Sequence, residues 1–286
     1  MTSQDITQST TQVVTSSVQI NALDSQLLAN FYQNTIGLTL ISESKGYYKL
    51  GTPDHKVLLE LFPNAIGKME RTTGLYHMAF LLPNKKDLGT ILQSFIDKQI
   101  PLQGAANHGY SNAIYLSDPE GNGIEIYYDK KQTEWDIRAT GYIVGITEPM
   151  DIDYVLEGAN PVFNGLPVGT TMGHIHLHVS DLEETLNFYR QILGLGLKYT
   201  IENQAYFLAS GNYHHHLGSN IWQGQNLPAP NTNTCGLRAS IWSATQIDYQ
   251  AIQSKLKEYH VKYNEDAHTL TFKDNSGLTV IVEMKN

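Results

Sequence analysis

The apolar and polar residues at the start of the chain follow an order that predicts one strand, one helix and three more strands. β-Branched residues alternate with polar ones over residues 12–22, which is typical of a strand. Apolar residues then recur at helical spacing over residues 24–37, where Asp24 can cap the helix and Gly37 can end it. Three short apolar stretches predict strands at residues 38–42, 47–50 and 57–62. The first module is therefore βαβββ.

The same βαβββ order recurs, so internal repetition is the main architectural feature of the sequence. The later modules begin with predicted strands near Leu75, Gly173 and Leu237. Two spaced matches support the repetition, namely Phe31-Tyr32-x4-Gly37-Leu38 with Phe188-Tyr189-x4-Gly194-Leu195, and Asp118-x2-Gly121 with Asp274-x2-Gly277. The chain therefore consists of two copies of a two-module unit.

The four modules predict an α+β fold with two domains of two modules each. We place the first domain at residues 12–129, a connecting segment at 130–171, and the second domain at 172–286. The connecting segment is too long for a tight turn, so we expect it to pack across the surface.

Composition narrows the range of functions. The 286 residues carry a formal net charge of −9 and no basic run, which argues against a nucleic-acid partner. No apolar stretch approaches the roughly 20 residues of a membrane span, and the polar N-terminus lacks the basic and apolar blocks of a signal peptide. The single cysteine, Cys235, excludes an internal disulfide and fits a reducing compartment. We therefore expect a cytoplasmic protein with no membrane partner.

Histidines are concentrated in one short stretch of the chain. His174, His176 and His178 alternate with apolar residues, so a strand would place all three on one face. An earlier stretch of similar pattern contains His77. Glu125 stands on an otherwise apolar strand, where burial of an unpaired carboxylate would be costly. A metal ion bound by such groups would remove that cost.

Three sets of residues carry a resemblance to a known family. They are the strand histidines His77 and His174, the pair Asn187-Phe188-Tyr189 and Leu193-Gly194-Leu195, and the string Leu116-Ser117-Asp118-Pro119-Glu120-Gly121-Asn122-Gly123-Ile124-Glu125. With them the chain resembles the vicinal oxygen chelate superfamily, which includes glyoxalase I, bleomycin-resistance proteins and extradiol dioxygenases. Its length and its Tyr213-His214-His215-His216 run look most like the two-domain bacterial catechol 2,3-dioxygenases. The resemblance implies that paired modules curl into two cup-shaped mixed-sheet barrels.

The resemblance also implies a metal ion held by two histidines and one glutamate, with Fe(II) expected and Mn(II) as the alternative. Module by module, the first-strand position holds Ser17, His77, His174 and Ala239, and the fourth-strand position holds Glu60, Glu125, Asn220 and Ile281. Two histidines and one carboxylate therefore come together if module 2 faces module 3. We expect that pairing, and module 1 facing module 4, within one chain or between subunits. Glu60 is then a remnant, a salt-bridge partner or part of a second site.

Three further residues receive catalytic roles from the resemblance. His215 corresponds to the family's acid–base histidine, with His214 and His216 as alternatives in register. Tyr115 corresponds to a tyrosine that hydrogen-bonds the substrate hydroxyl, and His108 is expected to face the same substrate. Core or cup-lining positions are expected for His176, His178, Tyr127, Trp222 and Trp242.

The function implied is extradiol cleavage of catechol or a substituted catechol by Fe(II) and O2, in which the ring opens beside the diol. The partners would be a small aromatic diol and O2. Two alternatives stay open. One is a metal-dependent enzyme of the glyoxalase or isomerase type, which would usually add a second carboxylate ligand. The other is a binding protein for small aromatics. A homo-oligomer also stays an option.

Overall fold

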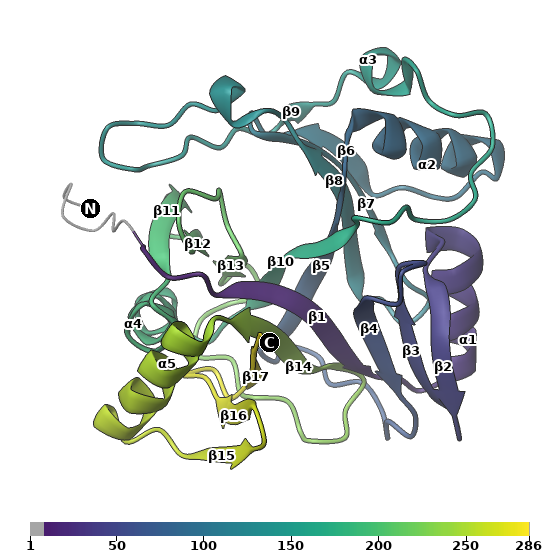
Figure 1. Cartoon of the computed structure of the whole chain (residues 1–286). Coiled ribbons are helices and arrows are strands. Elements are labelled where there is room, and N and C mark those ends of the chain that lie inside the picture. The colour runs from purple at the N-terminus through teal and green to yellow at the C-terminus, as the bar shows by residue number, and fades with distance from the viewer. Residues whose placement is uncertain (1–8, 286) are drawn as a thin grey trace.

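The computed structural model describes residues 9–285, and within that range the strands form two mixed sheets, one of eight strands and one of nine. Residues 1–8 and 286 lie outside the description. The predicted α+β class is confirmed by these sheets and the helices that cover them (Figure 1). We call the eight-stranded sheet sheet A and the nine-stranded sheet sheet B.

Sheet A combines the first and fourth modules. Its order is β15 (Tyr263–Asp266), β16 (Thr269–Lys273), β17 (Thr279–Met284), β14 (Gly236–Ala244), β1 (Val14–Asn21), β4 (Val57–Phe62), β3 (Tyr47–Gly51) and β2 (Thr39–Ser44). The two modules meet where β1 pairs antiparallel with β14, while β1 pairs parallel with β4 and β14 with β17.

Sheet B combines the third and second modules in the same manner. Its order is β11 (Gly196–Ile201), β12 (Ala205–Ala209), β13 (Leu217–Asn220), β10 (Thr171–His178), β5 (Gly74–Leu82), β8 (Gly123–Asp129), β7 (Ser111–Ser117), β6 (Gly104–Asn107) and β9 (Glu148–Pro149). The modules meet at the antiparallel pair of β10 and β5. The expected pairing of module 2 with module 3 is therefore found within one chain.

Helices cover the sheets from outside. They are α1 (Ser25–Phe31), the π-helical turn η1 (Tyr32–Ile36), α2 (Lys85–Asp97), the 3-10 turn η2 (Gln132–Glu134), α3 (Ile152–Leu156), α4 (Leu182–Leu193) and α5 (Gln246–Glu258). Asp24 accepts a hydrogen bond from the Leu27 amide over 2.9 Å and begins α1. Gly37, with φ of +89°, ends the π-helical turn. The helix predicted at residues 24–37 is thus divided into two parts.

The central strands of the two sheets lie against each other, with β1 next to β10 (Figure 1). The Thr15 hydroxyl donates to the Gly173 carbonyl over 3.2 Å across this contact. Helices α4 and α5, from different sheets, also contact each other. A hydrophobic core with members from both sheets fills the space between these layers.

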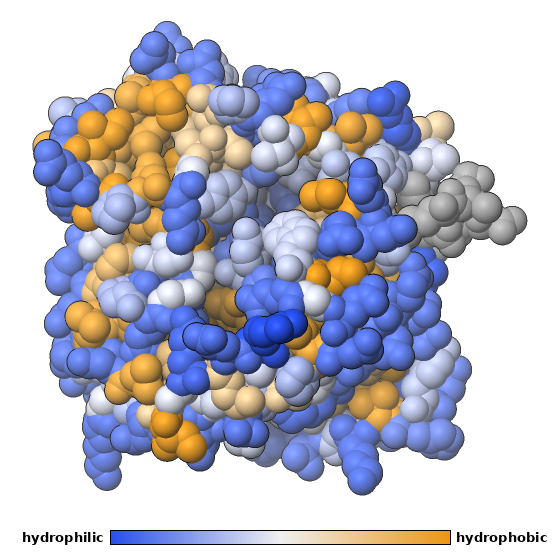
Figure 2. Space-filling view, turned by 180° about the vertical axis from the view of Figure 1, so that it is seen from behind, coloured by the Kyte–Doolittle hydropathy of each residue, from blue (hydrophilic) through white to orange (hydrophobic). Residues whose placement is uncertain are grey.

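The connecting segment runs over the outside of sheet B, as its length suggested. It adds the edge strand β9 and then α3, which packs on α2. Seen from behind, most of the surface is hydrophilic, and apolar residues gather at the upper left, on the side of α2 and α3 (Figure 2). No helix among residues 9–285 is long and apolar enough to cross a membrane. The predicted domain boundaries at 129–130 and 171–172 stay a prediction.

Candidate metal centre

The concave face of sheet B carries the chemistry, because strand alternation separates its two faces. On β8, Ile124 and Ile126 point into the core, whereas Glu125 points into the cup. On β10, Gly173 forms a bulge between the pairs Met172–Phe80 and His174–Ala79. A bulge re-aims the side chains that follow it, and here it turns His174 toward the cup.

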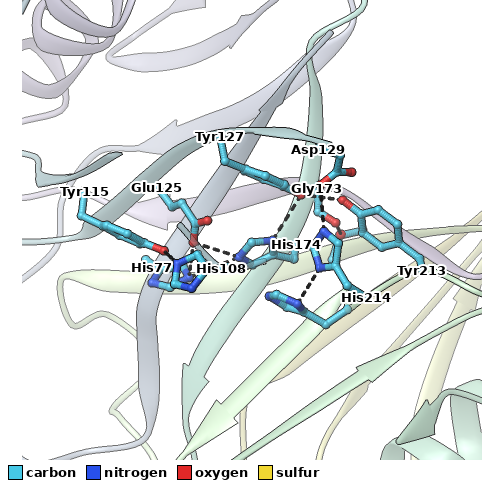
Figure 3. Close-up of polar contacts among 12 residues, drawn as sticks. His77, His108, Tyr115, Glu125, Tyr127, Asp129, Gly173, His174, Tyr213 and His214 are labelled. Carbon is cyan, nitrogen blue, oxygen red and sulfur yellow. Dashed lines mark hydrogen bonds and ion pairs between the residues drawn. The ribbon is translucent and has the colours of Figure 1, made fainter. Parts of the chain in front are cut away.

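Three buried side chains meet at this face: His77 from β5, Glu125 from β8 and His174 from β10 (Figure 3). Glu125 Oε2 lies 3.1 Å from His77 Nε2 and 3.1 Å from His174 Nε2. The two Nε2 atoms are 3.3 Å apart. Neighbouring octahedral ligands with bonds near 2.1 Å would be about 3.0 Å apart. The triangle therefore fits one face of a metal coordination sphere.

The electrostatics of the group also fit a cation. Burial would raise the pKa of Glu125, but the adjacent His174 and His77 side chains outweigh burial and hold that pKa well below its usual value. Burial lowers the pKa of His174 to about 4, so this imidazole is neutral at pH 7 and offers a lone pair. Two neutral imidazoles and one carboxylate are the donor set that non-haem Fe(II) sites use.

The three predicted catalytic residues lie around this group. The ring of His215 stands 4.1 Å from the ring of His174, centroid to centroid. Tyr115 faces His77 with ring centroids 5.9 Å apart, and its hydroxyl lies 2.6 Å from His108 Nε2. His108 Nδ1 bonds to the Ile146 carbonyl over 2.9 Å. The connecting segment therefore fixes the orientation of His108.

The histidine run resolves into three different environments. His215 lines the cavity described below, while His214 bonds to Asp129 over 2.9 Å. His216 Nδ1 accepts a hydrogen bond from the Ser210 amide over 3.2 Å. Of the three, His215 has the ring nearest to His174.

A cavity of about 1090 Å³ opens in front of the three-residue group. His77, Glu125, Tyr115, His108, His176 and Trp222 are among its lining residues. Its size and its mixed apolar and polar lining suit a small-molecule ligand. Residues from both modules of sheet B and from the connecting segment form its wall.

Comparison with known proteins places the chain in a family. The model described as Glyoxalase/Bleomycin resistance protein/Dioxygenase superfamily matches residues 16–126 and 171–277. The chain belongs to this superfamily. It is 42% identical over 212 residues to a catechol-2,3-dioxygenase of Bacillus subtilis, an alignment covering 72% of this chain and 74% of that protein.

Two solved structures have folds similar to that of this chain. A putative dioxygenase from Bacillus subtilis has a TM-score of 0.61 and 12% identity, with 97% of this chain and 86% of that chain covered. Glyoxalase I from Zea mays has a TM-score of 0.59 and 14% identity, with 96% and 92% covered. At these identities the likeness concerns the fold alone.

Glu60 on β4 of sheet A is the counterpart of Glu125 on β8 of sheet B, but its surroundings differ. Glu60 contacts Gln19 at 3.1 Å, Lys49 at 3.6 Å and the hydroxyl of Tyr47. Glu60 therefore acts as a salt-bridge and hydrogen-bond partner. Among residues 9–285, one cluster of three or more histidine, cysteine, aspartate or glutamate side chains has metal-site geometry. It is the group of His77, Glu125 and His174.

Sequence reasoning missed a second set of polar residues behind the metal group. Tyr127 was assigned to the core or the cup lining, and Asp129 received no role. Both follow Glu125 at intervals of two along β8, so they face the same side as Glu125. That spacing was the signal that would have found them.

Proposed function

We propose that this protein is an extradiol dioxygenase, which cleaves the ring of catechol or a substituted catechol with Fe(II) and O2. The observation that carries the proposal is the buried triangle of His77, Glu125 and His174 in a chain 42% identical to a catechol-2,3-dioxygenase. Mn(II) is the alternative ion, because the same ligands accept both metals.

His77, Glu125 and His174 would hold the metal, and their positions on three adjacent strands fix them before the ion arrives. Bound to this donor set, Fe(II) supplies redox activation of dioxygen and lowers the pKa values of catechol hydroxyls. A metal ion held by these three side chains would face the cavity, where substrate and dioxygen would bind.

Tyr115 and His108 would orient the diol. If His108 Nδ1–H donates to the Ile146 carbonyl, its Nε2 accepts from the Tyr115 hydroxyl, and the Tyr115 oxygen keeps lone pairs for a substrate hydroxyl. Burial, followed by the charge of Glu125, raises the pKa of Tyr115 well above its usual value. Tyr115 therefore stays protonated and acts as a hydrogen-bonding group.

His215 would move the proton. Burial is the main cause that lowers its pKa well below the usual value, so the imidazole is neutral and can accept a proton from a catechol hydroxyl. The same group can return that proton to the oxygen that becomes the product hydroxyl. Its place beside His174 brings it to the reacting side of the site.

The glyoxalase alternative is weaker because the second carboxylate, which would be the fourth metal ligand, is missing. The position is occupied by Asn220, whose Oδ1 lies 2.8 Å from His178 Nδ1. Among the described residues no fourth ligand, whether carboxylate or histidine, joins the three-residue group.

An anaerobic preparation loaded with Fe(II) tests the proposal. With catechol and O2 we expect oxygen uptake and a yellow ring-opened product. Glu125→Gln should lose bound iron and activity, whereas Glu60→Gln, the equivalent substitution in sheet A, should keep both. Iron retention without oxygen uptake on any catechol tested would refute the dioxygenase assignment.

A further inference from the structure

Asp129 at the end of β8 is the acceptor for a chain of two histidines. Asp129 Oδ1 lies 2.9 Å from His214 Nε2 (Figure 3). His214 Nδ1 in turn lies 2.7 Å from His215 Nδ1. The His214 side chain is 1% exposed and that of Asp129 is 20% exposed, so the contact is shielded from solvent. The proposed acid–base histidine is thus the end of a chain that begins at Asp129.

The direction of the hydrogen bonds follows from the chemistry of the groups. A carboxylate accepts only, so His214 must carry its proton on Nε2. When His214 is in its neutral form it accepts at Nδ1, and the proton in the second bond then belongs to His215 Nδ1. That arrangement leaves the lone pair of His215 on Nε2.

A second chain ends at the same carboxylate. His174 Nδ1 lies 3.3 Å from the Tyr127 hydroxyl, which lies 2.8 Å from the Tyr213 hydroxyl. Tyr213 in turn makes a side-chain hydrogen bond to Asp129. When His174 Nε2 binds a metal ion, its proton must lie on Nδ1, so every donor in this chain points toward Asp129.

Gly173 makes the second chain sterically feasible. A Cβ atom built at Gly173 would lie 1.8 Å from the Tyr127 hydroxyl oxygen, far inside contact distance. The bulge that turns His174 into the cup therefore also leaves space for the group that holds His174 Nδ1.

We propose that Asp129 is a positioning residue that fixes the tautomers of His215 and His174 through these two chains. The inference rests on the proposed function, since it assigns the acid–base and ligand roles to those histidines. An outer hydrogen bond of this kind typically changes metal affinity or activity about 10–100-fold. A wrong tautomer in an acid–base histidine can cost still more in kcat.

Asp129→Asn is the decisive variant, because it removes the negative charge on which both chains end and replaces one accepting oxygen with an NH2 group that can only donate. We expect kcat to fall at least about tenfold with KM within about twofold, or metal affinity to fall about 10–100-fold, or both. Tyr213→Phe should lower metal affinity and leave the tautomer of His215 unchanged. Asp136→Asn is the matched control, because Asp136 is half exposed and pairs with Arg138 away from these chains.

Nitrogen-15 NMR of the Zn(II)-loaded protein reads the tautomers directly and needs no turnover. In the wild type, His215 and His174 should each show a protonated Nδ1. Asp129→Asn should change the tautomer of at least one of the two histidines. Asp129→Glu, which keeps a carboxylate, should restore part of kcat. If the wild type cleaves no catechol, the dioxygenase proposal fails while the NMR and metal affinity still decide the role of Asp129. Unchanged tautomers, affinity and kcat in Asp129→Asn would overturn the inference.

Discussion

Tyr189 donates its hydroxyl proton to the buried carboxylate of Asp274 over 2.9 Å, and Tyr32 makes the same bond to Asp118, also over 2.9 Å. In each pair the tyrosine belongs to the helical part of one module and the aspartate to the last turn of the next module. Modules 1 and 2 belong to different sheets, as do modules 3 and 4, so each bond ties sheet A to sheet B. The spaced matches in the sequence therefore mark a repeated connection between the sheets.

Loss of this connection should destabilise the protein. Tyr189→Phe removes one of three donors to Asp274, the others being the amides of Ser276 and Leu278. We expect the free energy of unfolding to fall by about 1–3 kcal/mol, because a buried charged group loses a hydrogen bond. Urea unfolding measures the change, and Tyr259→Phe, at a 43% exposed position, is the control. Equal losses in both variants would contradict the proposed connection.

Asp274 should also make stability depend on pH. Burial is the main cause that raises its pKa from the ordinary 3.8 to about 6. A raised folded-state pKa gives a contribution that is fully present below pH 3.8 and is lost as pH rises through about 6. Between pH 4 and pH 7 the wild type should therefore lose roughly 2 kcal/mol relative to Asp274→Asn, which has no titrating group there. Urea unfolding across this range tests it. A constant difference between the two proteins would contradict the raised pKa.

The fold could be predicted from the sequence to the level of module order and module pairing. Repetition identified the four βαβββ units, and the ligand positions of His77, His174 and Glu125 indicated which modules share a sheet. The last two strands of sheet B, β6 and the edge strand β9, gave no signal, because Gly104–Asn107 and Glu148–Pro149 are short and do not alternate. Their strand form depends on pairing with each other and with β7, which local sequence does not encode.

The candidate site was predictable where a residue had a counterpart in the repeat. His77 and His174 occupy matching first-strand positions, so the register between modules located them. Asp129 and His214 are 85 positions apart and come from different modules, so only the pairing of β5 with β10 brings them together. Long-range side-chain contacts of this kind have no local pattern in the sequence.

If the chain is cut in the connecting segment, the two fragments should stay associated. The exposed turn at Ala139 and Thr140 lies between the halves, yet β1 pairs with β14 and β5 with β10 across them. We expect a variant with a protease site inserted after Thr140 to elute after cleavage as the uncut protein does. Denaturing electrophoresis should show two fragments. Separation of the fragments in native buffer would contradict the pairing of strands across the halves.

Metal should stabilise the fold through His174 and not through its neighbours on β10. His174 and Glu125 come from strands on either side of β5, so a shared ion links three strands of sheet B. An ion at a hundred times its Kd adds about 2.7 kcal/mol to the free energy of unfolding, which corresponds to a rise of about 5–10 °C in Tm for a chain of this size.

We therefore expect a chelator to lower Tm by that amount and Fe(II) or Mn(II) to restore it. His174→Gln should show no metal-dependent change. His178→Gln is the matched control because His178 lies on the same strand and bonds to Asn220, and it should keep the full shift. Calorimetry of the metal-free and metal-loaded proteins gives the comparison. If His178→Gln loses the shift and His174→Gln keeps it, the metal lies elsewhere in the cup.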